Sequence, residues 1–169
     1  MNRALKRRLI RFVNFWPPFL GAGIRLRRLS ADFREADVEM AQRFWNTNYV
    51  GVHFGGSLFA MTDAFYMLLL MENLGRNYVV WDKAASVRFR KPGRGTVRAE
   101  FRLSEAEIDE VRVAVAEKGI HERSFVVRIL DEGNEVVAEV EKLIHIRQKH
   151  NVSPAPNGLQ PRQPLAQEP

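Results

Sequence analysis

The strongest constraint on the fold is a run of 14 residues, 58–71, that is apolar on every side of any helix it forms (LFAMTDAFYMLLLM). The run is too short to span a bilayer, which needs about 20 apolar residues. A helix that is hydrophobic all round is instead buried inside its own protein. We therefore expect a helix from Gly56 to Leu74, ended by Gly75, with the rest of the chain wrapped around it.

Asp63 is the only charged residue inside this run. Burial of a carboxylate without partners costs several kcal/mol, so the position needs a physical reason. Three explanations are open for Asp63. It is a structural acid bonded to a nearby hydroxyl or amide, or it opens onto a water-filled crevice, or it is a catalytic or substrate-facing group. The last of these makes it the leading candidate for a catalytic residue.

Alternating apolar and polar residues predict six strands, which together with the buried helix give an α+β fold. The predicted strands are 24–30, 33–40, 78–90, 97–103, 124–130 and 136–147. Because a turn at 91–95 joins two of them, we expect 78–90 and 97–103 to form an antiparallel hairpin, and the four strands after the helix to follow one another in the sheet. Ser104 to Glu107 fits a capping box and predicts a short helix that ends at Gly119.

The net charge of +6 is local rather than spread over the chain. Residues 1–31 hold eight basic residues and no acid, whereas residues 32–169 hold 18 basic and 20 acidic residues. A nucleic-acid-binding domain carries its basic surface through the fold, so nucleic acid is not an expected partner. The absence of cysteine excludes disulfides and thiolate nucleophiles.

The chain divides into three parts. Residues 1–16 predict a basic amphipathic helix that lies on a membrane surface or docks on its own domain. Residues 17–149 form the folded domain, and the Pro-rich residues 150–169 are expected to be a disordered tail. The first segment lacks the uninterrupted apolar stretch of a signal peptide, so we expect a cytoplasmic protein. The apolar side of the amphipathic helix consists of Leu5, Leu9, Phe12, Val13 and Trp16.

The residues His53 to Ser57 (HFGGS) stand where a loop becomes the central helix. The first amides of a helix have no partner within the helix and carry the positive end of its dipole. Gly55 and Gly56 let a carbonyl or a phosphate approach these amides closely. Ser57 either caps the helix or faces the ligand. Phe59 stands where a Gly-x-Ser-x-Gly elbow needs its last glycine, which disfavours a serine hydrolase.

A longer motif resembles a known family. Asn48 to Gly56 (NYVGVHFGG), followed seven residues later by Asp63, resembles the signature of hotdog-fold acyl-CoA thioesterases of the phenylacetate-pathway type. The longer segments NYVGVHFGGSLFAMTDAFYMLLL and VWDKAASVRFRKPGRG are similar to a bacterial hotdog group largely labelled as a domain of unknown function, some members of which are called tetrameric acyl-CoA thioesterases. The resemblance covers residues 17–147 and implies a hotdog fold, an antiparallel sheet wrapped around one long helix. Phe54 holds the family's histidine position, and His53 lies one residue earlier.

The resemblance implies hydrolysis of an acyl-CoA to a free acid and CoA. The Gly56 amide, with the Gly55 amide, would polarise the thioester carbonyl, and Asp63 would act as general base or nucleophile. Asn48 would orient the water or the carbonyl, and His53 is a further candidate. This chemistry requires no metal or organic cofactor. The resemblance also implies a homodimer or homotetramer in which two subunits share each site.

The expected substrate contacts lie at the helix start and near one turn. Basic residues close to the turn at 91–95 either meet the nucleotide phosphates of CoA or are simply solvated. Two other functions stay open: a non-catalytic hotdog module that binds an acyl-CoA or an acyl chain, and a dehydratase or hydratase on the same fold. The predicted substrate contacts are Gly55, Ser57, Arg88, Arg90, Lys91 and Arg94, with Arg98 nearby.

Overall fold

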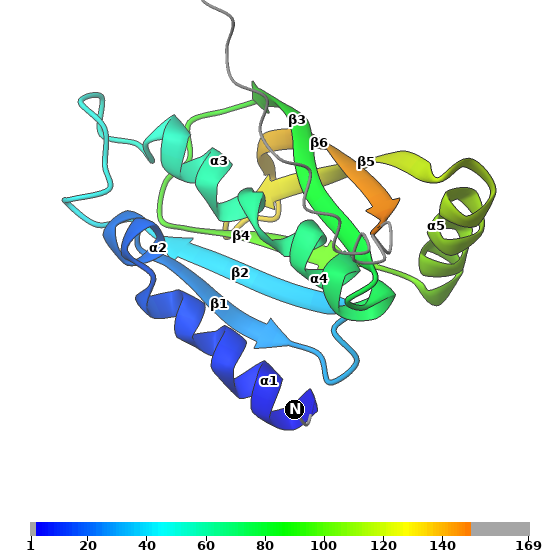
Figure 1. Cartoon of the computed structure of the whole chain (residues 1–169). Coiled ribbons are helices and arrows are strands. Elements are labelled where there is room, and N and C mark those ends of the chain that lie inside the picture. The colour runs from blue at the N-terminus through cyan, green and yellow to red at the C-terminus, as the bar shows by residue number, and fades with distance from the viewer. Residues whose placement is uncertain (1–2, 150–169) are drawn as a thin grey trace, which may run out of the picture.

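The protein is built on a six-stranded antiparallel sheet with the strand order β1-β2-β4-β5-β6-β3 (Figure 1). The computed structural model describes residues 3–149, so the predicted disordered tail over 150–169 lies outside the described residues. The six predicted strands and the α+β class are confirmed. The strands are β1 (Ile24–Leu29), β2 (Glu35–Ala41), β3 (Tyr78–Phe89), β4 (Thr96–Arg102), β5 (Ile120–Leu130) and β6 (Val136–Gln148).

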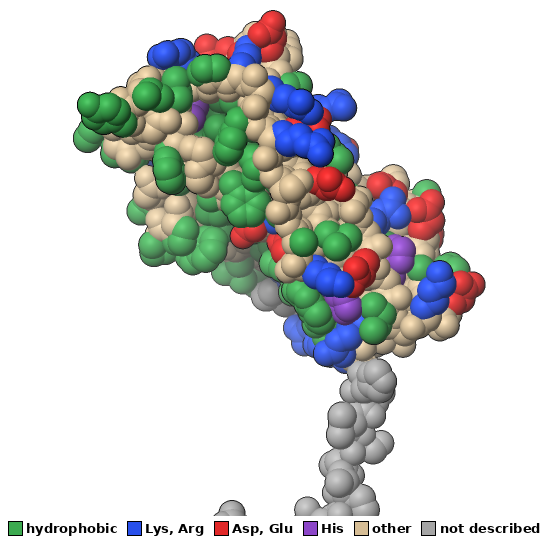
Figure 2. All heavy atoms as spheres, turned by 90° about the horizontal axis from the view of Figure 1, so that it is seen from above, with side chains coloured by type: hydrophobic (Ala, Val, Ile, Leu, Met, Phe, Trp, Pro, Cys, Tyr) green, Lys and Arg blue, Asp and Glu red, His purple; other side chains and the backbone are tan. Residues whose placement is uncertain are grey.

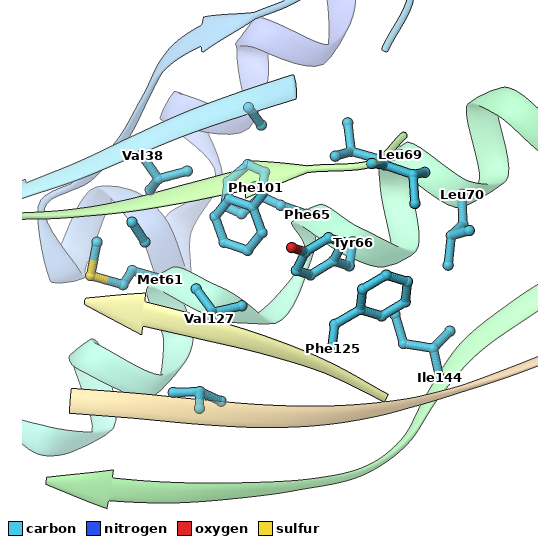
Figure 3. Packing of buried hydrophobic residues seen from close by; sticks show 14 of the residues in the cluster. Val38, Met61, Phe65, Tyr66, Leu69, Leu70, Phe101, Phe125, Val127 and Ile144 are labelled. Atoms are coloured by element: carbon cyan, nitrogen blue, oxygen red, sulfur yellow. The ribbon is translucent and has the colours of Figure 1, made fainter. Parts of the chain in front are cut away.

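Two helices, α3 (Gly55–Asp63) and α4 (Phe65–Leu74), run end to end across one face of this sheet and form the predicted central helix (Figure 1). Figure 3 shows their buried side chains against those of the strands. The Tyr66 ring stacks on Phe125 from β5 at a centroid distance of 4.1 Å and meets Phe101 from β4 edge-on at 5.3 Å. The expected hotdog arrangement, a sheet wrapped around a long helix, is confirmed.

The sheet covers only one side of the central helix, so the expectation that this helix is buried all round is wrong. Gly56 and Asp63 are exposed, Phe59 and Met67 are half-buried, and Met71 is 48% exposed. These positions lie on the side of the helix that faces away from the sheet. Because an open sheet curls over one side of a helix, the described part of a single chain leaves this apolar side only partly covered.

The central helix is interrupted at Ala64, and the cause lies on β6. The Nζ atom of Lys142 donates a hydrogen bond of 2.8 Å to the Asp63 carbonyl oxygen. In a regular helix that oxygen accepts the amide four residues further along the chain. A side chain that inserts into the helical hydrogen-bond ladder is a known source of such breaks.

The predicted hairpin of 78–90 with 97–103 is wrong. β3 pairs with β6 along its whole length, whereas β4 pairs with β2 and β5. Alternation of apolar residues shows that each strand has one dry face, but it does not identify the neighbouring strand. The six residues 90–95 extend to about 20 Å at most, which is enough to cross the three strand spacings of about 4.8 Å from β3 to β4.

Helix α5 (Glu105–Lys118) confirms the predicted capping box. The Ser104 side chain accepts the Glu107 amide, the Glu107 side chain accepts the Ser104 amide, and Gly119 ends the helix in the left-handed region at φ 74°. Three apolar side chains at helical spacing anchor the helix to the core. They are Ile108, Val111 and Val115.

The amino-terminal elements are α1 (Arg3–Ile10), the 3₁₀ helix η1 (Arg11–Phe15) and α2 (Pro17–Ala22). They lie along β1, at the opposite edge of the sheet from β3 (Figure 1). The Asn14 side chain accepts the Leu26 amide at 2.7 Å and donates to the Leu26 carbonyl at 3.2 Å, so it occupies the free edge of β1. Among residues 3–149, no helix has the length and apolar character needed to cross a membrane.

Candidate functional site

The loop before α3 is shaped by Asn48. Its Oδ1 atom accepts the amides of Val50 and Val52, both at 3.1 Å, and its backbone carbonyl accepts the Gly51 amide at 3.0 Å. Gly51 has a φ of +78°, a conformation that costs glycine little. Since the loop already uses the Asn48 carbonyl oxygen, the side-chain NH₂ group is the part of Asn48 left to bind a ligand.

His53 lies under the loop and is 2% exposed. Its Nε2 atom is 2.9 Å from the Gly95 carbonyl oxygen, so Nε2 carries the proton and donates this hydrogen bond. Nδ1 is buried and has no hydrogen-bond partner among the described residues. Burial lowers the pKa of His53, which keeps the ring neutral at pH 7. This arrangement matches a loop histidine bonded to the backbone.

The amides at the start of α3 are open. The Ser57 and Leu58 amides donate to the Phe54 carbonyl, whereas the Gly55 and Gly56 amides have no partner within the described residues. The N-cap residue is Phe54, whose side chain makes no capping hydrogen bond. Ser57 therefore does not cap the helix, contrary to one of its two predicted roles.

Two phenylalanine rings close over these glycines. A Cβ atom on Gly55 would lie 2.9 Å from Cζ of Phe89, and one on Gly56 would lie 2.4 Å from Cε1 of Phe54. Larger residues at these positions would force the rings to move. The glycines therefore allow aromatic side chains to pack closely against the first turn of α3.

A cavity of about 430 Å³ opens beside the start of α3. Figure 2 shows hydrophobic side chains gathered at the end of the molecule that carries the preceding loop. The cavity combines the free Gly55 backbone with apolar walls, and a polar head joined to an acyl or aromatic group requires both. Its lining includes Asn48, His53, Gly55, Leu58, Phe89 and Lys91.

Asp63 lies at the far end of α3 and is not the lone buried acid that the sequence suggested. Its side chain is 52% exposed, and its Oδ1 atom accepts a hydrogen bond of 2.9 Å from Lys142 Nζ. Lys142 is 1% exposed. The ion pair with Lys142 therefore engages one oxygen of a half-exposed carboxylate.

Lys142 also holds a second acid. Its Nζ atom donates to Asp82 Oδ2 at 3.0 Å, so the three ammonium protons meet the Asp63 carbonyl, the Asp63 carboxylate and Asp82. Burial raises the pKa of Asp82, and the hydrogen bond and charge of Lys142 act in the opposite direction. Asp82 Oδ1 is buried without a partner in the part of the chain that the structure describes.

Lys142 and Asp82 are not among the site residues predicted from the sequence, although the alternation of apolar residues along β6 points to Lys142. The residues Val140, Lys142 and Ile144 share the inner face of β6, so a lysine occupies a position that alternation assigns to the core. Such a lysine needs buried acceptors. Asp82 lies next to a β-bulge between Asp82 and Ala84, where the alternation of β3 shifts.

The predicted phosphate-binding residues are mostly occupied within the chain. Lys91 pairs with Asp131 at 2.5 Å and also with Glu135, and both contacts raise its pKa. Arg90 pairs with Glu139, and Arg94 donates to the Gly51 carbonyl at 2.9 Å. Within residues 3–149, the Arg88 side chain has no hydrogen bond or ion pair. Arg90 and Lys91 border the cavity, whereas Arg94 braces the loop.

The two halves of the predicted catalytic site lie apart in one chain. Gly56 and Asp63 are on the same exposed side of α3, seven residues and about 10.5 Å apart along the helix axis. Proton transfer to or from a carbonyl held at the helix start requires about 3 Å between heavy atoms. One chain therefore supplies an amide site and an acid that cannot reach the same substrate atom.

Comparison with known proteins gives one family and a set of solved structures. A family model described as a domain of unknown function (DUF4442) matches residues 6–146. Comparison with curated proteins gives no match. PA5026 from Pseudomonas aeruginosa, described as a protein of unknown function and probable thioesterase, superposes with a TM-score of 0.75 at 25% identity, covering 85% of this chain and 96% of that one.

Two further solved structures share the fold at lower identity. Thioesterase HI1161 from Haemophilus influenzae gives a TM-score of 0.62 at 14% identity, with 84% of this chain and 92% of that chain covered. The PaaI protein from the phenylacetic acid degradation operon of E. coli gives 0.59 at 16% identity, with 87% and 94% covered. These similarities show that the fold is that of hotdog thioesterases.

Proposed function

This chain belongs to the DUF4442 family, and from that premise we propose that it hydrolyses the thioester bond of an acyl-CoA. The observation that carries the proposal is the pair of unpartnered amides at Gly55 and Gly56 at the start of a helix, beside a largely apolar cavity that Gly55 lines. Helix amides in this position stabilise negative charge on an oxygen atom. A tetrahedral thioester intermediate develops its charge on such an oxygen.

In the proposed reaction, the thioester carbonyl oxygen accepts hydrogen bonds from the Gly56 and Gly55 amides. Asp63 takes a proton from water, and the water oxygen attacks the carbonyl carbon. The tetrahedral intermediate then collapses, the carbon–sulfur bond breaks, and the CoA sulfur receives the proton from Asp63. A direct attack by Asp63 through an anhydride is the alternative, and incorporation of oxygen-18 into Asp63 in a single turnover distinguishes it.

We propose that two subunits share each site. The exposed side of the central helix carries Gly56, Asp63 and Met71, and the outer edge of β3 has no partner strand within the described chain. A two-fold axis that sets two central helices antiparallel would bring the partner subunit's Asp63 towards Gly56. It would also cover the apolar side of the helix and the open edge of β3.

Lys142 is proposed as a positioning residue for Asp63. It holds Asp63 Oδ1 and the Asp63 carbonyl together, which fixes the side-chain rotamer and directs the other carboxylate oxygen outward. Replacement by methionine should lower kcat with little change in KM, because Lys142 acts through Asp63 and does not line the binding cavity. A change confined to KM would contradict this role.

One observation favours the non-catalytic alternative, an acyl-CoA-binding module. The Phe54 ring lies against Gly56, with its Cε1 atom 2.4 Å from the place that a Cβ atom would occupy. If this ring stays in place, a ligand can occupy the cavity without its carbonyl reaching Gly56. A Phe54→Ala variant would then gain turnover.

The test is release of free thiol from a panel of short, long and aromatic acyl-CoAs. The Asp63→Asn variant keeps the size of the side chain and removes the base, so it is the matched control for background hydrolysis. Turnover by the wild type that the variant loses supports the proposal. Binding without turnover across the whole panel, measured by calorimetry, supports the acyl-CoA-binding module instead.

A further inference from the structure

The amino-terminal segment docks on the domain through charged, apolar and polar side chains. The Lys6 Nζ atom pairs with Glu72 of α4 at 2.6 Å, and Ile10 and Val13 pack against the core. Asn14 completes the attachment through its two hydrogen bonds to Leu26 on the edge of β1. These contacts fix which side of α1 faces the domain and which side faces outward.

The apolar side of this segment faces outward. Six large apolar side chains along α1, η1 and α2, which we call the outer apolar face, are between 47% and 64% exposed. The Phe12 and Phe15 rings lie 6.1 Å apart on it. A docked amphipathic helix normally buries its apolar stripe, whereas this one leaves large apolar side chains exposed, a feature typical of binding surfaces. The outer apolar face consists of Leu5, Leu9, Phe12, Phe15, Trp16 and Leu20.

Arginine side chains lie on the same helix as the outer apolar face and on the neighbouring strand β1. Arg3 and Arg8 are exposed on the same helix, and Arg25 is exposed on the neighbouring strand β1. Within residues 3–149, none of the three forms an ion pair, whereas Arg27 and Arg28 on the same strand pair with Glu39, Glu35 and Asp37. The first 31 residues contain no acid that could neutralise this charge.

We propose that the outer apolar face binds the surface of an anionic phospholipid membrane. Aromatic and leucine side chains insert among the lipid headgroups and acyl chains, and the unpaired arginines contact lipid phosphates. A second copy of the chain fits less well, because two such faces would bring their unpaired arginines together without an acid between them. The face lies along β1, so a dimer formed through β3 leaves it free (Figure 1).

The test measures how the full chain partitions onto vesicles by co-sedimentation. Vesicles of phosphatidylcholine with about 30% phosphatidylglycerol should bind the protein, and pure phosphatidylcholine should bind it at least about tenfold more weakly. The double variant Phe12→Ser/Trp16→Ser should lose about tenfold or more of the binding to anionic vesicles. The matched control is Val113→Ser/Val126→Ser, which removes two equally exposed apolar side chains from α5 and β5 and should bind as wild type does.

Tryptophan fluorescence provides a second measurement. The chain has three tryptophans, and Trp45→Phe/Trp81→Phe leaves Trp16 as the only one. Its emission should shift to the blue on addition of anionic vesicles. Absence of binding by the wild type, or equal binding by Phe12→Ser/Trp16→Ser, would overturn the proposal. Self-association of the wild type in light scattering would also overturn the proposal if this double variant abolished it. The face would then be an interface between copies of the chain.

Discussion

Replacement of Lys142 by methionine is the most informative perturbation of this structure. Methionine keeps the length of the buried stem and removes the ammonium group, which donates three hydrogen bonds. The Asp63 carbonyl and Asp82 Oδ2 would each lose a buried donor, and Asp82 Oδ1 already has no partner among the described residues. The variant thus leaves a partly buried carboxylate without its counter-ion.

The cost follows from these contacts. An unsatisfied buried acceptor costs about 1–3 kcal/mol, and two acceptors are affected. The Asp63 carboxylate can recover its hydrogen bonds from water because its side chain is half exposed, so it adds little. Asp82 can avoid part of the cost by binding a proton. We expect the free energy of unfolding to fall by about 3 kcal/mol at pH 7.

The variant should also change the pH dependence of stability. Burial already raises the pKa of Asp82 above its usual value of 3.8, and removal of Lys142 raises it further. The folded variant then binds a proton at a higher pH than the unfolded chain does. Its free energy of unfolding should therefore increase, relative to wild type, as the pH falls from 7 through the raised pKa of Asp82 towards 3.8.

Urea unfolding of a double-mutant cycle measures both effects. Lys142→Met/Asp82→Leu replaces the cation and its buried acid with apolar side chains, so it should recover about 2 kcal/mol relative to the sum of the single variants. The reasoning is refuted if Lys142→Met lies within about 0.5 kcal/mol of wild type at pH 7, or if the two single effects simply add.

Three further predictions concern the loop and the shared site. Asp63→Asn should keep the fold and lose thioester turnover, and full activity of the purified variant would remove Asp63 from the mechanism. Mixing Gly56→Pro with Asp63→Ala should restore about a quarter of wild-type activity after random reassortment, and no recovery despite heterodimers seen by mass spectrometry would rule out a shared site. The lowered pKa of His53 means that the folded protein loses stability as the pH falls below 6.5, the usual pKa of histidine. His53→Gln keeps a donor to Gly95 and removes this titration, so its unfolding midpoint should change less between pH 7 and pH 5 than that of the wild type.

The sequence predicts those parts of the fold that depend on local patterns. The capping box at Ser104, the strands and the long apolar helix all follow from spacing within a few residues, and all are present. The pairing of β3 with β6 joins segments that lie about 60 residues apart, and alternation along each strand does not encode it. The predicted hairpin failed for this reason.

The same distinction between local patterns and contacts of distant residues applies to the candidate site. The open amides of Gly55 and Gly56 follow from the local rule that the first helical amides lack partners. The environment of Asp63 depends on Lys142, 79 residues away, and on Asp82, 60 residues from that lysine. No local pattern places these three side chains together, although a lysine on the dry face of a strand indicates that a buried acceptor must exist.

The break in the central helix links the fold to the proposed chemistry. Asp63 is the last residue of α3, where the carbonyl end of the helix dipole makes negative charge on a nearby carboxylate unfavourable. Lys142 offsets this effect because its ammonium group binds the terminal carbonyl and the carboxylate of the same residue. The carboxylate is half exposed on the side of the helix that the sheet leaves open. Under the proposed mechanism, this exposure is what allows Asp63 to act on a substrate held by a second subunit.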